Sequence, residues 1–275
     1  MENNREKIIF FGNGPLAEYA LAVIEQECQV IFHAHRKEDL TEAVRLKQEF
    51  PEAHGVLASF GVMIPELVLE AFEPEGILNV HPSLLPLYRG ASPIESAILD
   101  GDSDFSVSVM KLVKAMDAGP VYYQTTLTGA EISAKTGSEL VSGLIPPKSA
   151  IYQALAETGA EWICSHLGEL PEPVEQEGEP TFCGKMDKSM SLLAPETDTA
   201  EQTLRKIVAF QGYPKPKYSF FGVSCIILDA YVLKKGEEAP LTLKCADGRI
   251  LAIERLQPEG RKAMDAKAFI NGYKK

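Results

Sequence analysis

The sequence predicts an α/β protein in two parts: a larger one built on a doubly wound, mostly parallel sheet, and a small C-terminal β-barrel. Two observations lead to this prediction. Between residues 7 and 100, short apolar segments alternate with amphipathic segments of helical length. Beyond residue 200, short strand-like segments follow one another with turn residues between them. The first pattern is typical of strand–helix units that share one parallel sheet, and the second of a small antiparallel barrel.

The alternating segments divide the first part of the chain into four expected strands, each followed by a helix. Two of the helices open with a proline, Pro15 or Pro65, where a missing backbone N–H is tolerated. In order, the segments are KIIFFG, PLAEYALAVIEQE, CQVIFHAH, KEDLTEAVRLKQEF, AHGVLASFGVMI, PELVLEAF, GILNVH and ASPIESAILDG. This order implies a Rossmann-like sheet with helices on both faces.

Two further segments extend this sheet and its helical cover. Residues 105–127 predict an antiparallel hairpin that turns at Asp117–Gly119. Helices are expected between Gly137 and Gly168, with a break at the sequence IPPKS.

The division into domains follows from one proline-rich, acidic stretch, LPEPVEQEGEP, which has the composition of a linker. We therefore expect an N-terminal domain over residues 1–172, a linker over 173–198 and a C-terminal domain over 199–275. Thr199 and Gln202 form a capping box at the start of the C-terminal domain, ahead of an amphipathic helix. The strands expected after it are YSFFGVSCIILDAYVL, LTLKCADG and RILAIERLQ.

Composition excludes several classes of protein. Hydrophobic residues make up 45% of the 275 residues and charged residues 24%, as in ordinary globular proteins. No apolar run is long enough to span a bilayer, and the N-terminus lacks the pattern of a signal peptide, so we expect a cytoplasmic protein without membrane contact. The five cysteines are scattered and form no C-x-x-C pair, which favours reduced thiols over disulfides or a metal site. Without an extended apolar face, a monomer is expected.

Charge is unevenly spread along the chain. The net charge is −12, yet residues 200–275 hold 14 Lys and Arg against 8 Asp and Glu. A basic C-terminal domain on an acidic body either contacts a polyanion or keeps the two domains docked.

A glycine turn, Gly12-Asn13-Gly14-Pro15-Leu16-Ala17, follows the first expected strand and matches the G-x-G-x-x-A pattern of dinucleotide-binding proteins. The acidic residue that usually accompanies this pattern is missing from the end of the second strand, which reads HAH. A tight structural turn is therefore the favoured interpretation.

Asn79 and His81 stand two residues apart at the end of the fourth expected strand. Their side chains point to the same face of the sheet, at the carboxyl edge where open parallel sheets bind ligands. Taken alone, the pair is equally compatible with catalysis and with a buried histidine beside a capping asparagine. Asp117 would be an ordinary turn residue unless it lies near His81, where it would set the tautomer of the imidazole ring and raise its pKa.

The stiff loop PSLLPLYRGASP suits a flat ligand with polar edges, or else packs its leucines into the core.

The combination NVHPSLLPLYRGASP followed by MDAGP resembles the folate-dependent formyltransferases. The late segment LQPEGRKAMDAKAFINGY is similar to the C-terminal tail of those members that act on methionyl-tRNA. The resemblance implies a Rossmann-like catalytic domain with an OB-like C-terminal barrel. It also implies transfer of a formyl group from 10-formyltetrahydrofolate to initiator methionyl-tRNA for translation initiation, without a metal.

The resemblance assigns roles to particular residues. It implies a catalytic trio of Asn79, His81 and Asp117. The residues implied to bind the folate are Ser83, Leu84, Leu85, Pro86, Val62, Met63, Ile64 and Met116. The cations implied to contact tRNA are Arg36 and Lys37 after the second strand and Lys215, Lys217, Arg261 and Lys262 in the basic C-terminal domain.

The chemistry of formyl transfer fits the trio. Attack of an amine on the formyl carbon builds an oxyanion and leaves a surplus proton. A donor such as the Asn79 amide is worth about 3 kcal/mol at such an oxyanion. His81 would act as a second donor or as the proton acceptor, and Asp117 would orient it. Two alternatives stay open: a formyltransferase for an amino-sugar nucleotide, and a non-catalytic folate- or dinucleotide-binding protein.

Overall fold

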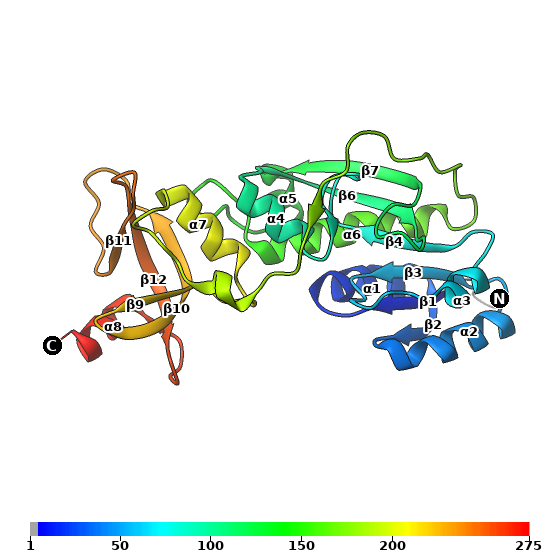
Figure 1. The fold of residues 1–275 in the computed structure, drawn as a ribbon, viewed down its shortest axis with the longest axis horizontal. Coiled ribbons are helices and arrows are strands. Elements are labelled where there is room, and N and C mark those ends of the chain that lie inside the picture. The colour runs from blue at the N-terminus through cyan, green and yellow to red at the C-terminus, as the bar shows by residue number, and fades with distance from the viewer. Residues whose placement is uncertain (1–4, 275) are drawn as a thin grey trace. The chain divides into compact units, whose positions relative to one another are not determined.

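The computed structural model describes residues 5–274, which form two compact units (Figure 1). The N-terminal unit comprises residues 5–93, Asp104–Gly137 and Ser149–Gly184. The C-terminal unit comprises Ile94–Ser103, Ser138–Lys148 and residues 185–274. Among the residues described, no helix combines the length and hydrophobicity needed to cross a lipid bilayer.

A six-stranded sheet in the order β2-β1-β3-β4-β6-β7 is the centre of the N-terminal unit. The first four strands in this order are parallel, and β6 and β7 are antiparallel additions. The chain runs outward from β1 to β2 and then crosses back to β3, so the strand order reverses between β1 and β3, where α/β sheets bind ligands. The strands are β1 (Lys7–Gly12), β2 (Gln29–Ala34), β3 (His54–Ala58), β4 (Ile77–His81), β6 (Asp104–Lys111) and β7 (Val121–Thr128).

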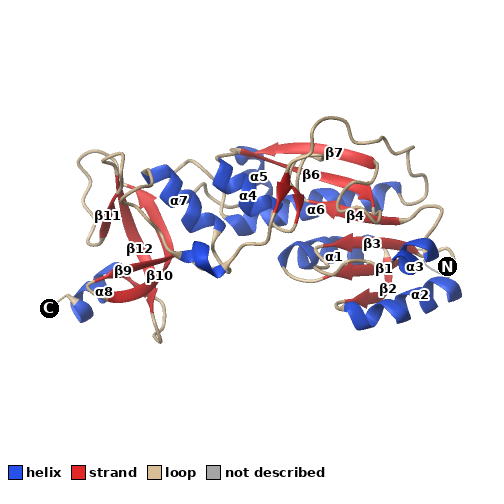
Figure 2. Cartoon of the chain, viewed as in Figure 1, coloured by secondary structure: helices blue, strands red, loops and turns tan. Residues whose placement is uncertain are grey.

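Helices cover this sheet because its central strands are apolar on both faces (Figure 2). Ile8, Ile9, Phe10 and Phe11 of β1 are all fully buried. The helices of the unit are α1 (Pro15–Glu27), η1 (Lys37–Asp39), α2 (Leu40–Glu49), α3 (Glu66–Ala71), α5 (Gly129–Thr136) and α6 (Lys148–His166).

Two segments differ from the expectation. The helix expected just after Gly137 instead lies before it, as α5, because Thr128 and Glu131 form a capping box and Gly137 ends the helix at φ +69°. Pro146 and Pro147 keep the next segment non-helical until α6 begins.

The other difference concerns the expected linker, residues 173–198, whose first part is an ordered piece of the N-terminal unit. Val174 and Val121 of β7 exchange two backbone hydrogen bonds, and β8 (Phe182–Cys183) pairs with β5 (Arg89–Gly90). Extended, proline-rich backbone leaves its polar groups free for such pairing. The domain boundaries stay predictions.

The C-terminal unit holds an antiparallel sheet in the order β11-β12-β10-β9, with β13 paired to β12. Helix α7 packs on it through Leu204 and Ile207 and begins at the predicted capping box of Thr199 and Gln202. The elements are α4 (Pro93–Asp100), η2 (Lys188–Ser191), α7 (Ala200–Ala209), β9 (Lys217–Phe220), β10 (Val223–Val232), β11 (Thr242–Lys244), β12 (Ile250–Pro258), β13 (Met264–Asp265) and α8 (Ala266–Tyr273).

Candidate active site

Asn79 and His81 occupy the carboxyl end of β4, a strand paired on both sides. Asn79 lies opposite Leu57 of β3 and Met110 of β6, and His81 lies opposite Ser108 of β6. Each of the two residues is only 4% exposed. A central strand with both neighbours in place holds them rigidly on one face of the sheet, as predicted.

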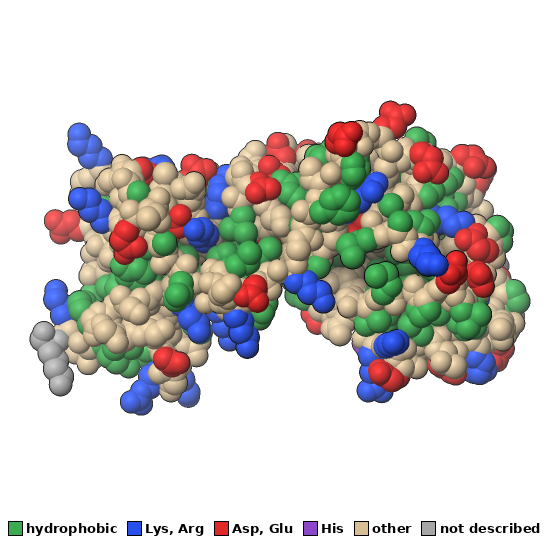
Figure 3. Space-filling model, viewed as in Figure 1, with side chains coloured by type: hydrophobic (Ala, Val, Ile, Leu, Met, Phe, Trp, Pro, Cys, Tyr) green, Lys and Arg blue, Asp and Glu red, His purple; other side chains and the backbone are tan. Residues whose placement is uncertain are grey.

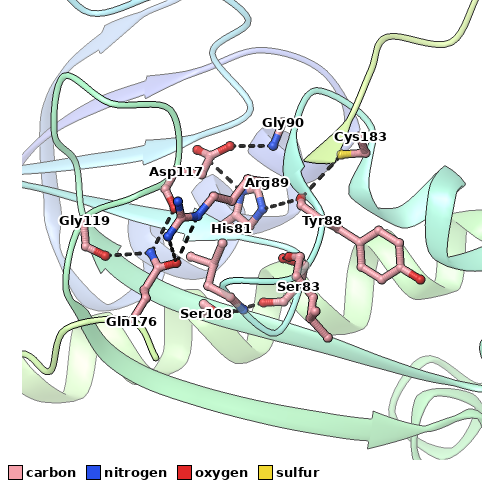
Figure 4. Close-up of polar contacts among 12 residues, drawn as sticks. His81, Ser83, Tyr88, Arg89, Gly90, Ser108, Asp117, Gly119, Gln176 and Cys183 are labelled. Atoms are coloured by element: carbon pink, nitrogen blue, oxygen red, sulfur yellow. Dashed lines mark hydrogen bonds and ion pairs between the residues drawn. The ribbon is translucent and has the colours of Figure 1, made fainter. Parts of the chain in front are cut away.

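The ring of His81 is oriented by a backbone carbonyl (Figure 4). Nε2 lies 3.1 Å from the carbonyl oxygen of Tyr88. Because a carbonyl oxygen can only accept, the neutral ring carries its hydrogen on Nε2 and leaves a lone pair on Nδ1. Nδ1 lies 3.8 Å from Oδ1 of Asp117, which is longer than a direct hydrogen bond.

Asp117 comes close to His81 from the turn that joins β6 to β7. Its backbone is left-handed, with φ +48°, a conformation that aspartate tolerates better than most residues. Its Oδ2 accepts a hydrogen bond of 2.8 Å from the backbone N–H of Gly90. Asp117 therefore lies opposite Nδ1 with one carboxylate oxygen anchored and the other facing the ring.

Burial lowers the pKa of His81 below its ordinary value, since desolvation disfavours the charged imidazolium. Asp117 and the carbonyl of Tyr88 oppose this effect, and Arg89 adds to it. Asp117 raises the pKa of His81 as expected, but burial outweighs the carboxylate, and the net shift is downward. His81 is thus neutral at pH 7 and able to accept a proton.

The side-chain amide of Asn79 has no hydrogen-bond partner within residues 5–274. The amide is not fully enclosed by the protein, so a ligand can reach it. Its two N–H donors stay available to a ligand at the edge of the sheet. Asn79 therefore brings free donors to the place where His81 brings a free acceptor.

The loop from Ser83 to Pro86 is held by two polar residues that the sequence interpretation missed. Ser108 Oγ donates to the carbonyl of Ser83 at 2.6 Å and accepts from the N–H of Leu85 at 3.1 Å. Gln124 Nε2 donates to the carbonyl of Leu85 at 2.8 Å and to Ser108 Oγ at 2.9 Å. The only signal in the sequence was a serine in the middle of an apolar strand, SVSVM.

Replacing Ser108 with alanine is expected to lower the free energy of unfolding by about 1–3 kcal/mol, because buried loop groups lose their partner. It should also raise the KM for the folate donor that the resemblance implies. Urea denaturation and steady-state kinetics measure the two effects. Ser106, two residues earlier on the same strand, bonds only the exposed hydroxyl of Thr126, and Ser106→Ala should change stability by less than about 0.5 kcal/mol. Equal behaviour of the two variants would show that Ser108 does not hold the loop.

The remaining residues implied to bind the folate are exposed, half-buried or buried, and Val62 and Pro86 are half-buried. Met63 and Met116 are 68% and 54% exposed, and Leu84 is 40% exposed, so all three offer apolar surface. Ile64 and Leu85 are buried, and Ile64 belongs to the hydrophobic core between the sheet and its helices. The buried members shape the loops, while the exposed ones are free to contact a ligand.

The cations implied to contact tRNA lie in both units. Arg36 and Lys37 follow β2, where Asp39 pairs with the Arg36 guanidinium at 3.4 Å and reduces its free charge. Lys217 is the first residue of β9, and Lys215 lies two residues before it. Arg261 and Lys262 lie between β12 and β13. Both kinds of charged side chain, Lys and Arg as well as Asp and Glu, are visible over each unit (Figure 3).

The glycine turn after β1, Gly12 to Gly14, serves the packing and the backbone geometry of the strand-to-helix connection. A Cβ at Gly12 would lie 2.7 Å from Cβ of Ala17 and 2.8 Å from the carbonyl oxygen of Ala58. Gly14 has φ +82° and precedes α1. Close approach of helix and strand accounts for Gly12, and the positive φ accounts for Gly14, without a nucleotide.

Two family models match the chain: formyl transferase over residues 15–140, and formyl transferase, C-terminal domain, over residues 185–274. Together with the sheet and the edge that carries Asn79 and His81, these matches define a formyltransferase. The methionyl-tRNA formyltransferase of Thermus thermophilus is 33% identical over 252 residues, which cover 86% of this chain and 75% of that protein. The chain belongs to the methionyl-tRNA formyltransferase family.

Solved structures confirm the predicted fold. The methionyl-tRNA formyltransferase from Clostridium thermocellum superposes with a TM-score of 0.64 at 17% identity and covers 92% of this chain and 98% of that one. HypX from Aquifex aeolicus in complex with tetrahydrofolic acid superposes with a TM-score of 0.71 at 18% identity over 99% of this chain. The chain spans 48% of HypX, about half its length.

Proposed function

We propose that this enzyme transfers the formyl group of 10-formyltetrahydrofolate to the amino group of methionine on initiator tRNA. The observation that carries the proposal is the pairing of free donors on Asn79 with a free acceptor, Nδ1 of His81, at the end of one rigid strand. Amine attack on a formyl carbon needs a group of each kind, on opposite sides of the reacting carbon.

The proposed steps use these groups in turn. The amine nitrogen bonds to the formyl carbon, and the carbonyl electrons move to oxygen, where the Asn79 amide donates to the oxyanion. Nδ1 of His81 takes the surplus proton from the attacking nitrogen. The imidazolium then has Nε2–H on the Tyr88 carbonyl and Nδ1–H facing Asp117, so both of its hydrogens meet acceptors. Collapse breaks the bond to the folate nitrogen, which receives the proton.

The formyl donor would occupy the loop of Ser83–Pro86 and the exposed Met63, Leu84 and Met116. Hydrogen bonds from Ser108 and Gln124 fix this loop, so little order would have to be created on binding. The tetrahydrofolate complex of the structurally similar HypX supports this class of ligand.

Initiator tRNA is the acceptor we propose because of the relatives' activity and the charge of the C-terminal unit. Residues 200–275 carry 14 Lys and Arg against 8 Asp and Glu, in a chain with a net charge of −12. Neutralisation of phosphates by such cations releases counterions and makes binding salt-dependent.

Replacing Lys217 or Arg261 with alanine is expected to weaken tRNA binding for all tRNA sequences alike and to reduce the slope of log K against log salt by about 1. Filter binding or fluorescence anisotropy across a salt series measures this. Lys135→Ala is the matched control, since Lys135 is paired with Glu161 on the N-terminal unit. A slope unchanged by Lys217→Ala and Arg261→Ala would contradict the proposed contact.

A second acceptor, an amino-sugar nucleotide, is favoured by one feature. Only His35 and Arg36 separate β2 from η1, which leaves little chain there to reach a tRNA acceptor stem. A competition assay with 10-formyltetrahydrofolate and both acceptors decides between them. Formylated methionyl-tRNA supports the proposal, and formylation of the sugar alone overturns the acceptor while it keeps the chemistry.

A further inference from the structure

Gln176 connects the two loops that shape the candidate site, although it lies in the segment expected to be a linker. Its Nε2 donates to the carbonyl of Asp117 at 2.9 Å and to that of Gly119 at 2.7 Å. Its Oε1 accepts from Nε and Nη2 of Arg89 at 3.2 and 2.7 Å. All four contacts appear in Figure 4.

The orientation of this amide is unambiguous. Carbonyl oxygens only accept and a guanidinium only donates, so the nitrogen of Gln176 must face the turn and its oxygen must face Arg89. Both amide hydrogens are used, and the oxygen is used twice. No other side chain of this size could match both loops, because a carboxylate lacks the two donors and a thioether lacks donors altogether.

The two loops joined by Gln176 are the ones that surround His81. The turn of Asp117–Gly119 presents Oδ1 of Asp117 to Nδ1, and the segment of Tyr88–Gly90 presents a carbonyl to Nε2. The Gly90 N–H holds the other oxygen of Asp117. Asp117 lies in a left-handed conformation that a non-glycine residue keeps only when its surroundings hold it there.

The rest of the same segment adds further anchors. Thr181 Oγ1 accepts from the N–H of Tyr88 at 2.8 Å, and Cys183 Sγ lies 3.4 Å from the carbonyl oxygen that His81 contacts. Val174 and Val121 tie the start of the segment to β7. Gln176 is the member of this segment that reaches both loops at once through its side chain.

We propose that Gln176 is a positioning residue for formyl transfer: it holds Asp117 opposite Nδ1 of His81 and keeps the guanidinium of Arg89 engaged. This inference rests on the proposed role of His81 and Asp117. Gln176 contacts main-chain groups of the site, so it acts through Asp117 and Arg89 and does not touch the reacting atoms.

Replacing Gln176 with methionine, which keeps the length and removes all four bonds, is expected to lower kcat by about 10- to 100-fold, the effect of a displacement of about 1 Å at a reacting group. The KM for the formyl donor should change less than about twofold. Gln176→Glu keeps the acceptor for Arg89 but loses both donors, and it should lose kcat as well. Gln153→Met is the matched control, since the half-buried Gln153 amide donates to Glu157 within the same helix, α6.

The pH profile separates positioning from loss of stability. Asp117 and Arg89 are the charged groups that act on His81, the first favouring the imidazolium and the second disfavouring it. Release of Asp117 lowers the pKa of His81 and release of Arg89 raises it. Because Asp117 has the larger effect of the two, the acid limb of kcat/KM should move to lower pH in Gln176→Met. Lower stability alone would not move this limb.

A double-mutant cycle with Asp117→Ala completes the test. If Gln176 acts through Asp117, Gln176→Met should change kcat by less than about twofold in the Asp117→Ala background. An equal loss in both backgrounds, or an unmoved acid limb in Gln176→Met, would overturn the positioning role. The activity of His81→Ala, measured alongside, separates the two proposals. If His81→Ala stays active, the proposed catalytic mechanism is refuted. If His81→Ala is inactive, the negative result refutes only the positioning role of Gln176.

Discussion

His81→Ala is expected to lower kcat for formyl transfer by about three orders of magnitude, because it removes the group that takes the surplus proton. His81→Gln should be equally inactive. Its amide can still donate to the carbonyl of Tyr88, but it has no base to replace Nδ1. Steady-state formylation at saturating donor measures both variants. His54→Ala is the matched control, since His54 is a half-buried histidine at the amino end of β3, where it contacts Glu6 and Glu75.

The pH dependence of the unmodified enzyme gives a second measure of His81. Burial lowers its pKa, so the neutral, active ring persists as the pH falls below the ordinary histidine value of about 6.5. The acid limb of kcat/KM should therefore lie below pH ~6.5. Activity retained by His81→Ala, or an acid limb well above this value, would contradict the role of His81 as the proton acceptor and favour a binding protein.

Asn79→Ala is the second large effect we expect: a fall in kcat of about 10²- to 10³-fold, the usual cost of one oxyanion donor. Binding of the formyl donor should stay nearly unchanged, because the amide acts on charge that develops only during the reaction. Asn79→Asp should be at least as inactive, since a carboxylate repels the oxyanion. Single-turnover formylation and equilibrium folate binding separate the two effects.

Asn271→Ala, an exposed change on α8, serves as the control for Asn79. A loss confined to folate binding in Asn79→Ala, with kcat unchanged, would assign Asn79 to the binding of the donor and remove it from the chemical step.

Several features of the protein could be predicted from the sequence because they depend on neighbouring residues. Apolar periodicity predicted the longer strands, though not the short β5, β8 and β13, and the prolines at helix starts predicted α1 and α3. The capping box of Thr199 and Gln202 predicted the start of α7. Asn79 and His81 could be placed on one face by the two-residue repeat of a strand. The N-x-H, S-L-L-P and D-A-G-P motifs pointed to formyl transfer, which the family models and relatives bear out.

Local sequence patterns gave wrong expectations for elements whose structure depends on residues far away in the chain. The stretch LPEPVEQEGEP has a linker's composition, yet Val174 pairs with β7 and Gln176 bonds residues 57 to 87 positions away along the chain. Neither pairing leaves a trace in composition. The sequence pattern does not predict α5, because Gly137 ends this helix at a position where the pattern suggests that a helix begins.

The sequence by itself determined the α/β architecture, the strand that carries Asn79 and His81, and the class of chemistry, because spacing along a strand and short motifs are local properties. Only the tertiary structure decided how these groups work. The carbonyl of Tyr88 selects the Nε2 tautomer, burial lowers the pKa of His81 against the pull of Asp117, and Gln176 joins two loops at the ring. Each of these depends on desolvation and on hydrogen bonds between segments far apart in the chain, and folding alone brings those segments together.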